Sequence, residues 1–174
     1  MKKTAFLLLT LATFLPLEAN NMKASPKCVE HIKKYEKCSL TAYADGNGYT
    51  IGWGHHTPQV TPNMVITQKQ ADKWLAEDIA EAEKYANHLI KSLPYKYNFS
   101  QGFFDGLVSL IYNCGCGNIR NSKFFNTLKK CRVTKGTMNR TDYAFTISLV
   151  RNTCTTANGH RKRRATEARM MNTL

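Results

Sequence analysis

Two acidic residues, nine positions apart, are the first candidates for chemistry in this sequence. Glu36 lies near the end of a segment with helical spacing, and Asp45 opens the turn Asp45-Gly-Asn-Gly48. Two carboxyl groups that face each other across a cleft can hydrolyse a glycosidic bond, because one protonates the leaving oxygen while the other activates water or stabilises the cationic transition state. A helix C-terminus disfavours a carboxylate, which suits Glu36 to the acid role, whereas Asp45 in a wet turn stays ionised.

Thr50 extends this pair, because its hydroxyl on the returning strand can hold the water beside Asp45. The spacing alone leaves the ordinary alternative open, in which Glu36 is a solvated helix-end residue and Asp45 is a turn former. The choice between the two depends on the elements that surround these residues.

The elements on either side of the pair can be read from capping and turn residues. Ser25-Pro26 is a helix start, with a capping side chain followed by proline at the first helical position, and it predicts a helix over about 26–37. The turn residues after Asp45 are flanked by Leu40–Tyr43 and Tyr49–Trp53, which predicts a small hairpin.

A long amphipathic helix follows. Thr67 and Gln70 form a capping box. The apolar residues behind them recur at helical period and are Ala71, Trp74, Leu75, Ile79, Ala82, Ala86, Leu89 and Ile90. The run over 101–113 is apolar almost all round, as in a buried central helix, and Gly115 and Gly117 are expected to end it. Shorter helices are predicted over 121–130, 141–151 and 161–171.

These elements make one α+β unit, in which a long helix joins a small β-hairpin lobe to a larger helical lobe. The 174 residues suffice for a single domain, and 43% hydrophobic residues exclude a disordered tail, a fibre or a multi-span membrane protein. The net charge of +13 is uneven, because residues 114–174 carry +11 of it. Such a charge predicts an anionic partner.

The N-terminus narrows the choice of partner. Met1-Lys2-Lys3 and the apolar run from Thr4 to Leu17 predict a signal peptide over 1–19. An uncleaved signal-anchor that tethers the chain to the inner membrane, or a buried N-terminal helix, are the alternatives. Export makes a nucleic-acid partner unsuitable and an acidic cell-wall polymer suitable. We therefore expect a periplasmic or extracellular protein, as a monomer.

Export would place the cysteines in a compartment where disulfides can form. The chain has six cysteines: Cys28, Cys38, Cys114, Cys116, Cys131 and Cys154. An even number in an exported chain favours disulfides, in a connectivity that the sequence leaves open, and buried free thiols are the alternative in a reducing compartment. Cys114-Gly-Cys116 lacks the spacing of a zinc knuckle, so no metal site is expected.

Four ordered segments resemble the phage-type lysozymes, or endolysins, of glycoside hydrolase family 24. The signature of that family is a Glu, an AY segment, an Asp nine residues after the Glu, and then TIGYGH. The matching segments here are Tyr35–Asp45 with Tyr49–His55, Thr67–Asp78, Phe104–Gly115 with Ser122 and Leu128, and Gly159 with Arg163, Arg164 and Glu167.

The resemblance implies a lysozyme domain over 20–174 that hydrolyses the β-1,4 bond between N-acetylmuramic acid and N-acetylglucosamine in peptidoglycan. It implies that Glu36 is the general acid, that Asp45 orients the attacking water with Thr50 as its partner, and that no metal or cofactor is needed. Two positions depart from the family pattern. Lys37 replaces a glycine, and Thr50 follows Asp45 by five residues instead of six. These departures leave a catalytically impaired wall-binding protein, or a cationic antibacterial protein, as alternatives.

Other residues receive secondary roles. Tyr43 and Trp53 can stack on sugars or pack the hairpin. His55 is expected to be structural, with Asp78 as its partner across the lobes. The basic tract His160–Arg164 is expected to face the wall, with Arg161 or Arg164 near the Glu36 side of the cleft, although a solvated helix face is an equal alternative.

Overall fold

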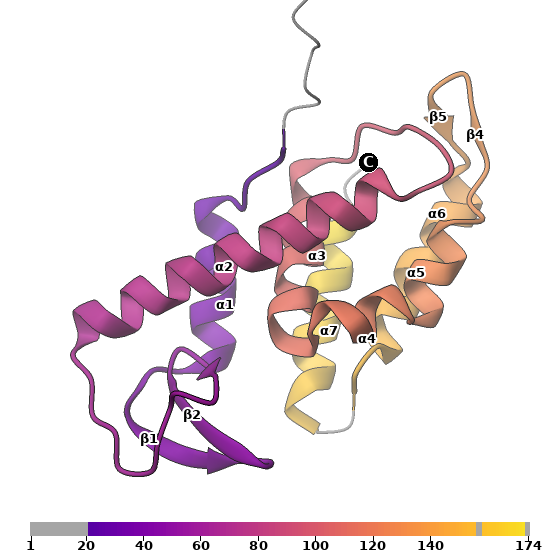
Figure 1. The fold of residues 1–174 in the computed structure, drawn as a ribbon. Coiled ribbons are helices and arrows are strands. Elements are labelled where there is room, and N and C mark those ends of the chain that lie inside the picture. The colour runs from indigo at the N-terminus through magenta and orange to yellow at the C-terminus, as the bar shows by residue number, and fades with distance from the viewer. Residues whose placement is uncertain (1–20, 156–157, 173–174) are drawn as a thin grey trace, which may run out of the picture.

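A helix of 24 residues, α2 (Gln68–Lys91), joins a small lobe of strands to a larger lobe of helices (Figure 1). The structure is a computed structural model that describes residues 21–155 and 158–172. The expected signal segment over 1–19 lies outside the described residues. Helix α2 begins where the capping box predicts, because the Thr67 hydroxyl accepts a hydrogen bond of 3.2 Å from the backbone N–H of Gln70.

Helix α1 (Pro26–Glu36) precedes the small lobe and packs its buried residues Cys28 and Ile32 into the core of the large lobe. The small lobe contains the antiparallel strands β1 (Ser39–Asp45), β2 (Gly48–Gly52) and β3 (His55–His56), in the order β1-β2-β3. The predicted hairpin is therefore present and carries a short third strand. Its register places Asp45 opposite Gly48 and Thr50 opposite His56. Two of the three predicted catalytic residues thus lie on neighbouring strands.

Helix α1 ends at Glu36, because the next residue leaves the helical conformation. Lys37 has φ 54°, in the left-handed region that favours glycine. Its backbone N–H still donates to Lys33 O, which closes the last turn at 3.3 Å. The family glycine that Lys37 replaces therefore stands where the backbone has a positive φ.

The large lobe surrounds α3 (Gln101–Cys114), which is buried over most of its length as its all-apolar sequence predicts. The remaining helices are α4 (Cys116–Arg120), α5 (Lys123–Leu128), α6 (Arg140–Ser148), the 3-10 helix η1 (Leu149–Asn152) and α7 (Asn158–Met171). The predicted α+β class, with a small hairpin lobe and a larger helical lobe, is confirmed.

One local prediction in the large lobe was wrong, and one element was not predicted. Gly115 ends α3 with φ 77°, but the chain re-enters a helix at once, so Gly117 lies inside α4. A second short hairpin, β4 (Val133–Thr134) and β5 (Thr137–Met138), was not expected. Its two-residue strands are too short to show an alternating pattern in the sequence.

A short segment before α1 is fixed to the back of the fold. Buried Glu83 on α2 accepts hydrogen bonds from Lys23 Nζ at 2.8 Å and from the Ala24 N–H at 2.7 Å. Buried Asp105 on α3 accepts from the Ser25 N–H at 2.9 Å and from its hydroxyl at 2.5 Å. We call residues 21–25 the N-terminal strap; it supplies hydrogen-bond donors to two buried carboxylates, of which Asp105 also accepts from Gln101 Nε2 at 2.8 Å.

No helix in the described part of the chain is long and apolar enough to cross a membrane. All six cysteines carry free thiols in the structure, two of them buried, Cys28 and Cys131.

The contact between α3 and α7 depends on a glycine. A Cβ atom on Gly106 would lie 2.6 Å from Met171 Cγ and 3.2 Å from the backbone oxygen of Glu167. Gly117 on α4 is exposed and has open space around the same position. The two glycines therefore form a matched pair.

We expect Gly106→Ala to lower the free energy of unfolding by about 1–3 kcal/mol, because α7 must shift to admit the methyl group. Gly117→Ala should raise the same free energy by about 0.5–1 kcal/mol, because alanine loses less conformational entropy than glycine in a helix. Urea unfolding measures both values. Equal effects of the two substitutions would contradict this account of the α3–α7 contact.

Candidate active site

The Glu36 side chain, at the end of α1, is held by a guanidinium from the far end of the chain. Arg163 on α7 donates from Nη1 to Glu36 Oε1 and from Nε to Glu167 Oε1, the latter at 3.1 Å. The Arg163 side chain is 3% exposed and that of Glu36 is 17% exposed. Glu36 is therefore largely enclosed, with a fixed cation at one of its oxygens.

Glu167 anchors this cation from behind. Its fully buried carboxylate accepts from Ser109 Oγ at 2.6 Å and lies 2.8 Å from Arg164 Nη1. Burial lowers the pKa of Arg163, but the carboxylates of Glu36 and Glu167 raise it by more, so the net shift is upward and the guanidinium stays charged. Two arginines thus face two carboxylates across α1, α3 and α7.

The arginine in contact with Glu36 is not one of the two that the sequence had suggested. Arg164 is fully buried and is bound to Glu167 and to Asn113 Oδ1, so it faces the core. Arg161 is exposed on α7. Successive side chains on a helix point about 100° apart. Of the three arginines, it is therefore Arg163 that points towards Glu36.

The second Glu36 oxygen lies against the turn between β2 and β3. A Cβ atom on Gly54, which has φ 98°, would come within 3.0 Å of Glu36 Oε2. Glycine is required at this position both by the backbone conformation and by the carboxylate. This contact brings the acid to the strand pair that carries Thr50 and His56.

Asp45 and Thr50 are in direct contact. The Thr50 side chain, 2% exposed as a residue, places Oγ1 3.0 Å from Asp45 Oδ2 and 2.9 Å from His56 Nδ1. Asp45 itself is exposed at the end of β1. The five-residue spacing therefore still allows the hydroxyl to reach the carboxylate.

The pKa of the Tyr43 phenol is affected by both candidate carboxylates. Burial raises the pKa of the Tyr43 phenol, and the negative charges of Asp45 and Glu36 raise it further. The phenol is 45% exposed as a residue, so it can also meet a ligand. Glu36 from α1 and Asp45 from the hairpin thus share one electrostatic environment.

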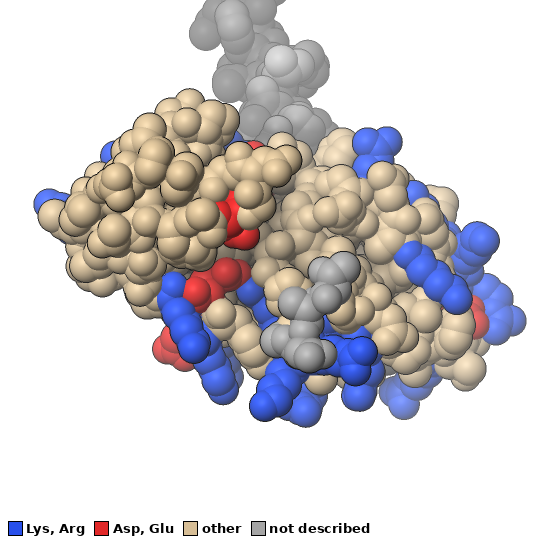
Figure 2. All heavy atoms as spheres, turned by 90° about the horizontal axis from the view of Figure 1, so that it is seen from below, with Lys and Arg blue, Asp and Glu red and all other residues tan. Residues whose placement is uncertain are grey.

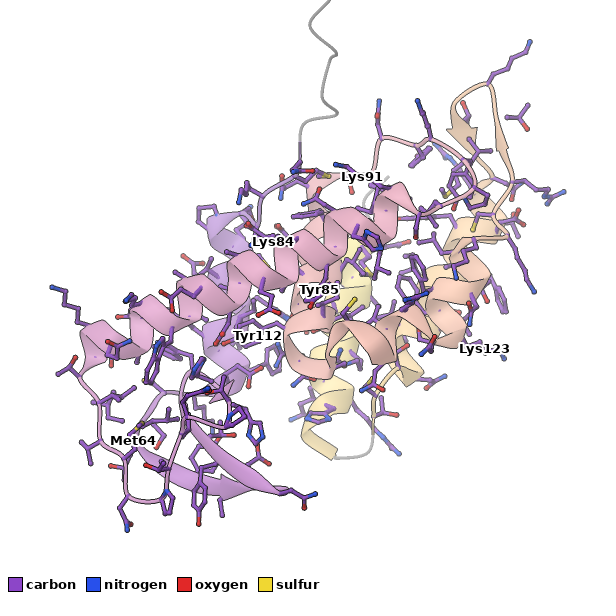
Figure 3. All side chains as sticks on the ribbon, viewed as in Figure 1. Met64, Lys84, Tyr85, Lys91, Tyr112 and Lys123 are labelled. Carbon is purple, nitrogen blue, oxygen red and sulfur yellow. The ribbon has the colours of Figure 1, made fainter. Side chains whose placement is uncertain are left out.

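A cavity of about 310 Å³ begins beside these groups and runs between the lobes. Its lining residues are Gly54, His56, Asp78, Glu81, Ala82, Tyr85, Ile111, Tyr112, Gly115 and Cys116. Figure 3 shows two of them, Tyr85 on α2 and Tyr112 below it. Figure 2 shows acidic atoms gathered in the recess between the lobes, with Lys and Arg atoms around the rim.

Two polar contacts attach the small lobe to α2. His55 Nδ1 donates to Asp78 Oδ2 at 2.9 Å, and its ring stacks on Trp74 with centroids 4.6 Å apart. Trp53 Nε1 donates to Asp72 Oδ1 at 2.9 Å. We call these contacts the two latches of the small lobe.

The second latch also involves α1. Lys33 Nζ donates to the same Asp72 oxygen at 2.9 Å and lies 4.8 Å from the centroid of the Trp53 ring. Tyr112 donates its hydroxyl to Trp53 O at 2.8 Å. The Trp53 indole is therefore engaged by protein groups, which leaves Tyr43 as the more accessible of the two aromatic candidates.

Within the described residues, no cluster of three His, Cys, Asp or Glu side chains could hold a metal ion. The arrangement supports acid–base chemistry: an enclosed carboxyl lies beside a cation, an exposed carboxylate has a hydroxyl partner, and Gly54 and His56, which contact Glu36 and Thr50, line the cavity.

A profile of the phage lysozyme family matches residues 33–167. The chain belongs to the phage lysozyme family. The solved structure of the endolysin from Escherichia coli O157:H7 phage FAHEc1 has a TM-score of 0.69 and 27% sequence identity to it, covering 87% of this chain and 94% of that one. Its fold is thus shared with another member of the family over nearly the full length of both chains.

Two curated relatives agree with this assignment. The endolysin of Bacillus phage PZA is 36% identical over 114 residues, which cover 64% of this chain and 42% of that endolysin. The endolysin of Lactococcus phage c2 is 45% identical over 97 residues, covering 54% and 40% respectively. The chain therefore spans about two fifths of the length of these relatives.

In this member of the phage lysozyme family, two contacts were not predicted from the sequence: that of Arg163 with Glu36 and that of His56 with Thr50. Arg163 belongs to the family segment quoted above, but its side-chain direction could not be assigned. His56 is exposed, and the strand register that pairs it with Thr50 could not be predicted from the sequence, because β3 has only two residues.

The pH dependence of stability tests the latch at Asp72. Hydrogen bonds from Lys33 and Trp53 hold the pKa of Asp72 below 3.8, so the folded state prefers the carboxylate. The stabilisation is present above pH 3.8 and is lost as the pH falls through the folded-state pKa. We expect Asp72→Asn to lower Tm at pH 7 and to approach the wild-type Tm below pH 3.8.

Thermal unfolding between pH 7 and pH 3 measures this difference. Glu77→Gln, an exposed change on the same helix, is the control and should leave Tm unchanged. A difference between Asp72→Asn and wild type that stays constant over this range would contradict the ionic latch.

Proposed function

We propose that the chain is a muramidase, a peptidoglycan hydrolase that cleaves the β-1,4 bond between N-acetylmuramic acid and N-acetylglucosamine. Glu36 is the general acid, and Asp45 with Thr50 positions the attacking water. The observation that carries the proposal is the pair of unlike carboxyl environments, one enclosed beside Arg163 and one exposed beside Thr50. The names of the related endolysins support the same substrate class.

The two carboxyl groups differ in the direction of their proton transfer. Glu36 donates its proton to the leaving glycosidic oxygen and becomes a carboxylate beside Arg163. The buried cation favours this developing negative charge in the transition state. Asp45, exposed at the end of β1, takes up a proton from the attacking water as that water adds to the sugar.

The substrate contacts and the location follow from the same assignment. Tyr43, 45% exposed, is suited to meet a sugar face, and Trp53 supports the hairpin beside it. The +11 charge of residues 114–174 attracts an anionic wall polymer, an attraction that salt weakens. Action on the wall requires export, which we assign to segment 1–19 as a cleaved signal or a retained anchor.

A second candidate, an impaired wall-binding or cationic antibacterial protein, is favoured by Lys37. This residue adds a positive charge directly after Glu36 and adopts φ 54° where the family has glycine. The Asp45–Thr50 contact at 3.0 Å favours the enzyme instead, because the shorter hairpin keeps the two groups together.

Glu36→Gln and Asp45→Asn should each lower the rate of wall hydrolysis by about 10²- to 10⁴-fold, as expected for loss of an acid or base group. Turbidity of bacterial walls and release of reducing sugar measure the rate. Asp45→Asn should keep Tm near the wild-type value, whereas Glu36→Gln should lower it, because the buried Arg163 loses one of its two carboxylate partners. Glu30→Gln, an exposed change on α1, is the matched control with full activity. Bacterial killing that survives Glu36→Gln would establish the charge-driven alternative.

The export assignment also concerns the cysteines, and we infer that Cys114 and Cys154 form a disulfide in the exported protein. Burial raises the pKa of the Cys114 thiol and the neighbouring Cys154 thiol raises it further, so the two thiols are close, and both side chains pack partly buried against the core. A low-molecular-weight disulfide in the oxidising compartment takes up the two electrons and two protons, and it leaves as two thiols.

The protein purified from an oxidising compartment should yield a linked peptide pair that contains Cys114 and Cys154. Reduction should lower the free energy of unfolding by about 2–4 kcal/mol, since the bond closes a loop of roughly 40 residues. Mass spectrometry and urea unfolding measure the two effects. Cys114→Ser should remove the linked pair, and Cys116→Ser should retain it; free Cys114 in the oxidised protein would contradict the assignment.

A further inference from the structure

His56 is the polar group in the candidate site to which the family pattern gives no role. Its Nδ1 lies 2.9 Å from Thr50 Oγ1, on the opposite side of a hydroxyl that also lies 3.0 Å from Asp45 Oδ2. The three side chains form a row across β1, β2 and β3, and His56 also lines the interlobe cavity. A threonine hydroxyl has one proton and two lone pairs, so the direction of these two hydrogen bonds is constrained.

The constraint comes from Asp45. An ionised carboxylate only accepts hydrogen bonds, so the proton between Thr50 and Asp45 must belong to Thr50. The contact between Thr50 and His56 then needs its proton from the imidazole, which places a hydrogen on Nδ1. With a bare Nδ1 the hydroxyl would turn towards His56, and Asp45 would lose its donor.

We propose that His56 is a positioning residue, which donates from Nδ1 to Thr50 so that the Thr50 hydroxyl donates to Asp45. One Thr50 lone pair then remains for a proton of the attacking water. His56 thus fixes the orientation of the Thr50 hydroxyl, and through it the hydrogen bond between Thr50 and Asp45. The catalytic part of this inference rests on the proposed function, whereas the proton position on Nδ1 does not.

The packing of the imidazole supports a fixed position for it. A Cβ atom on Gly48 would lie 2.9 Å from His56 Cε1 and 3.1 Å from Nε2, so the ring occupies the space that the glycine leaves. The backbone φ of Gly48 is not positive, so the turn itself does not require glycine at this position. The absence of a side chain at Gly48 therefore serves the ring and not the turn.

Substitutions at His56 separate a donor at Nδ1 from a merely structural ring. Asparagine places its amide N–H at the position of Nδ1, glutamine places it at the position of Nε2, and leucine places no donor at either. His56→Leu and His56→Gln should lower kcat by about tenfold with KM unchanged, as for loss of one hydrogen bond in the transition state. His56→Asn should stay within about threefold of wild type.

Two further variants test the route through Thr50. Gly48→Ala keeps the histidine but displaces its ring, and it should reproduce the kcat loss of His56→Leu. In a Thr50→Val background, His56→Leu should cause no further loss, because the hydroxyl that it orients is gone. His88→Leu, at an exposed histidine near the end of α2, is the control for a surface change.

Long-range ¹H–¹⁵N spectra of the wild-type protein read the proton position directly, and the expected result is a neutral His56 protonated at Nδ1. A neutral His56 protonated only at Nε2, a His56→Asn variant as slow as His56→Leu, or additive losses in the Thr50 double variant would each overturn the proposal. Absence of hydrolysis by the wild type would overturn the proposed function and leave the spectroscopic result to stand on its own.

Discussion

The buried guanidinium of Arg163 is the interaction on which the site depends. It joins a carboxylate at the end of α1 to one on α7, and the two residues of the Glu36–Arg163 pair are 127 positions apart in the chain. Arg163 and its buried neighbour Arg164 are stable there only while their carboxylate partners are present, because an unpaired buried charge costs several kcal/mol. The candidate acid is therefore positioned only when the last helix has folded back against the first.

The small lobe is held by a different kind of contact. Its connections to α2 include the two latches, in which Trp53 and His55 donate to partly exposed aspartates, and a small apolar contact of Gly52 with Ala71. Burial raises the pKa of Asp78, although His55 opposes this shift. The large lobe thus carries a dense buried network, whereas the strands that carry Asp45 and Thr50 are attached through polar contacts at a partly solvated boundary.

Capping residues and turn chemistry were enough to predict the elements that carry the site. Thr67 and Ser25 cap the helices where expected, and the Asp45–Gly48 turn closes the hairpin. Helical phase could not be predicted to within one residue, so the arginine near Glu36 was placed at Arg161 or Arg164 instead of Arg163. Gly117 was taken as a stop because the sequence does not show that Gly115 alone breaks the helix and that a new one starts beside it.

The placement of both latches on one helix has a dynamic consequence. Asp72 and Asp78 are less than two turns apart near the start of α2, a stiff rod of 24 residues. A tilt of the strands about this end of the rod must break both of these hydrogen bonds together with the Tyr112–Trp53 contact on α3. Domain motions occur in microseconds to milliseconds. The width of the recess between the lobes is therefore tied to one short stretch of α2 and to a single hydroxyl of the large lobe.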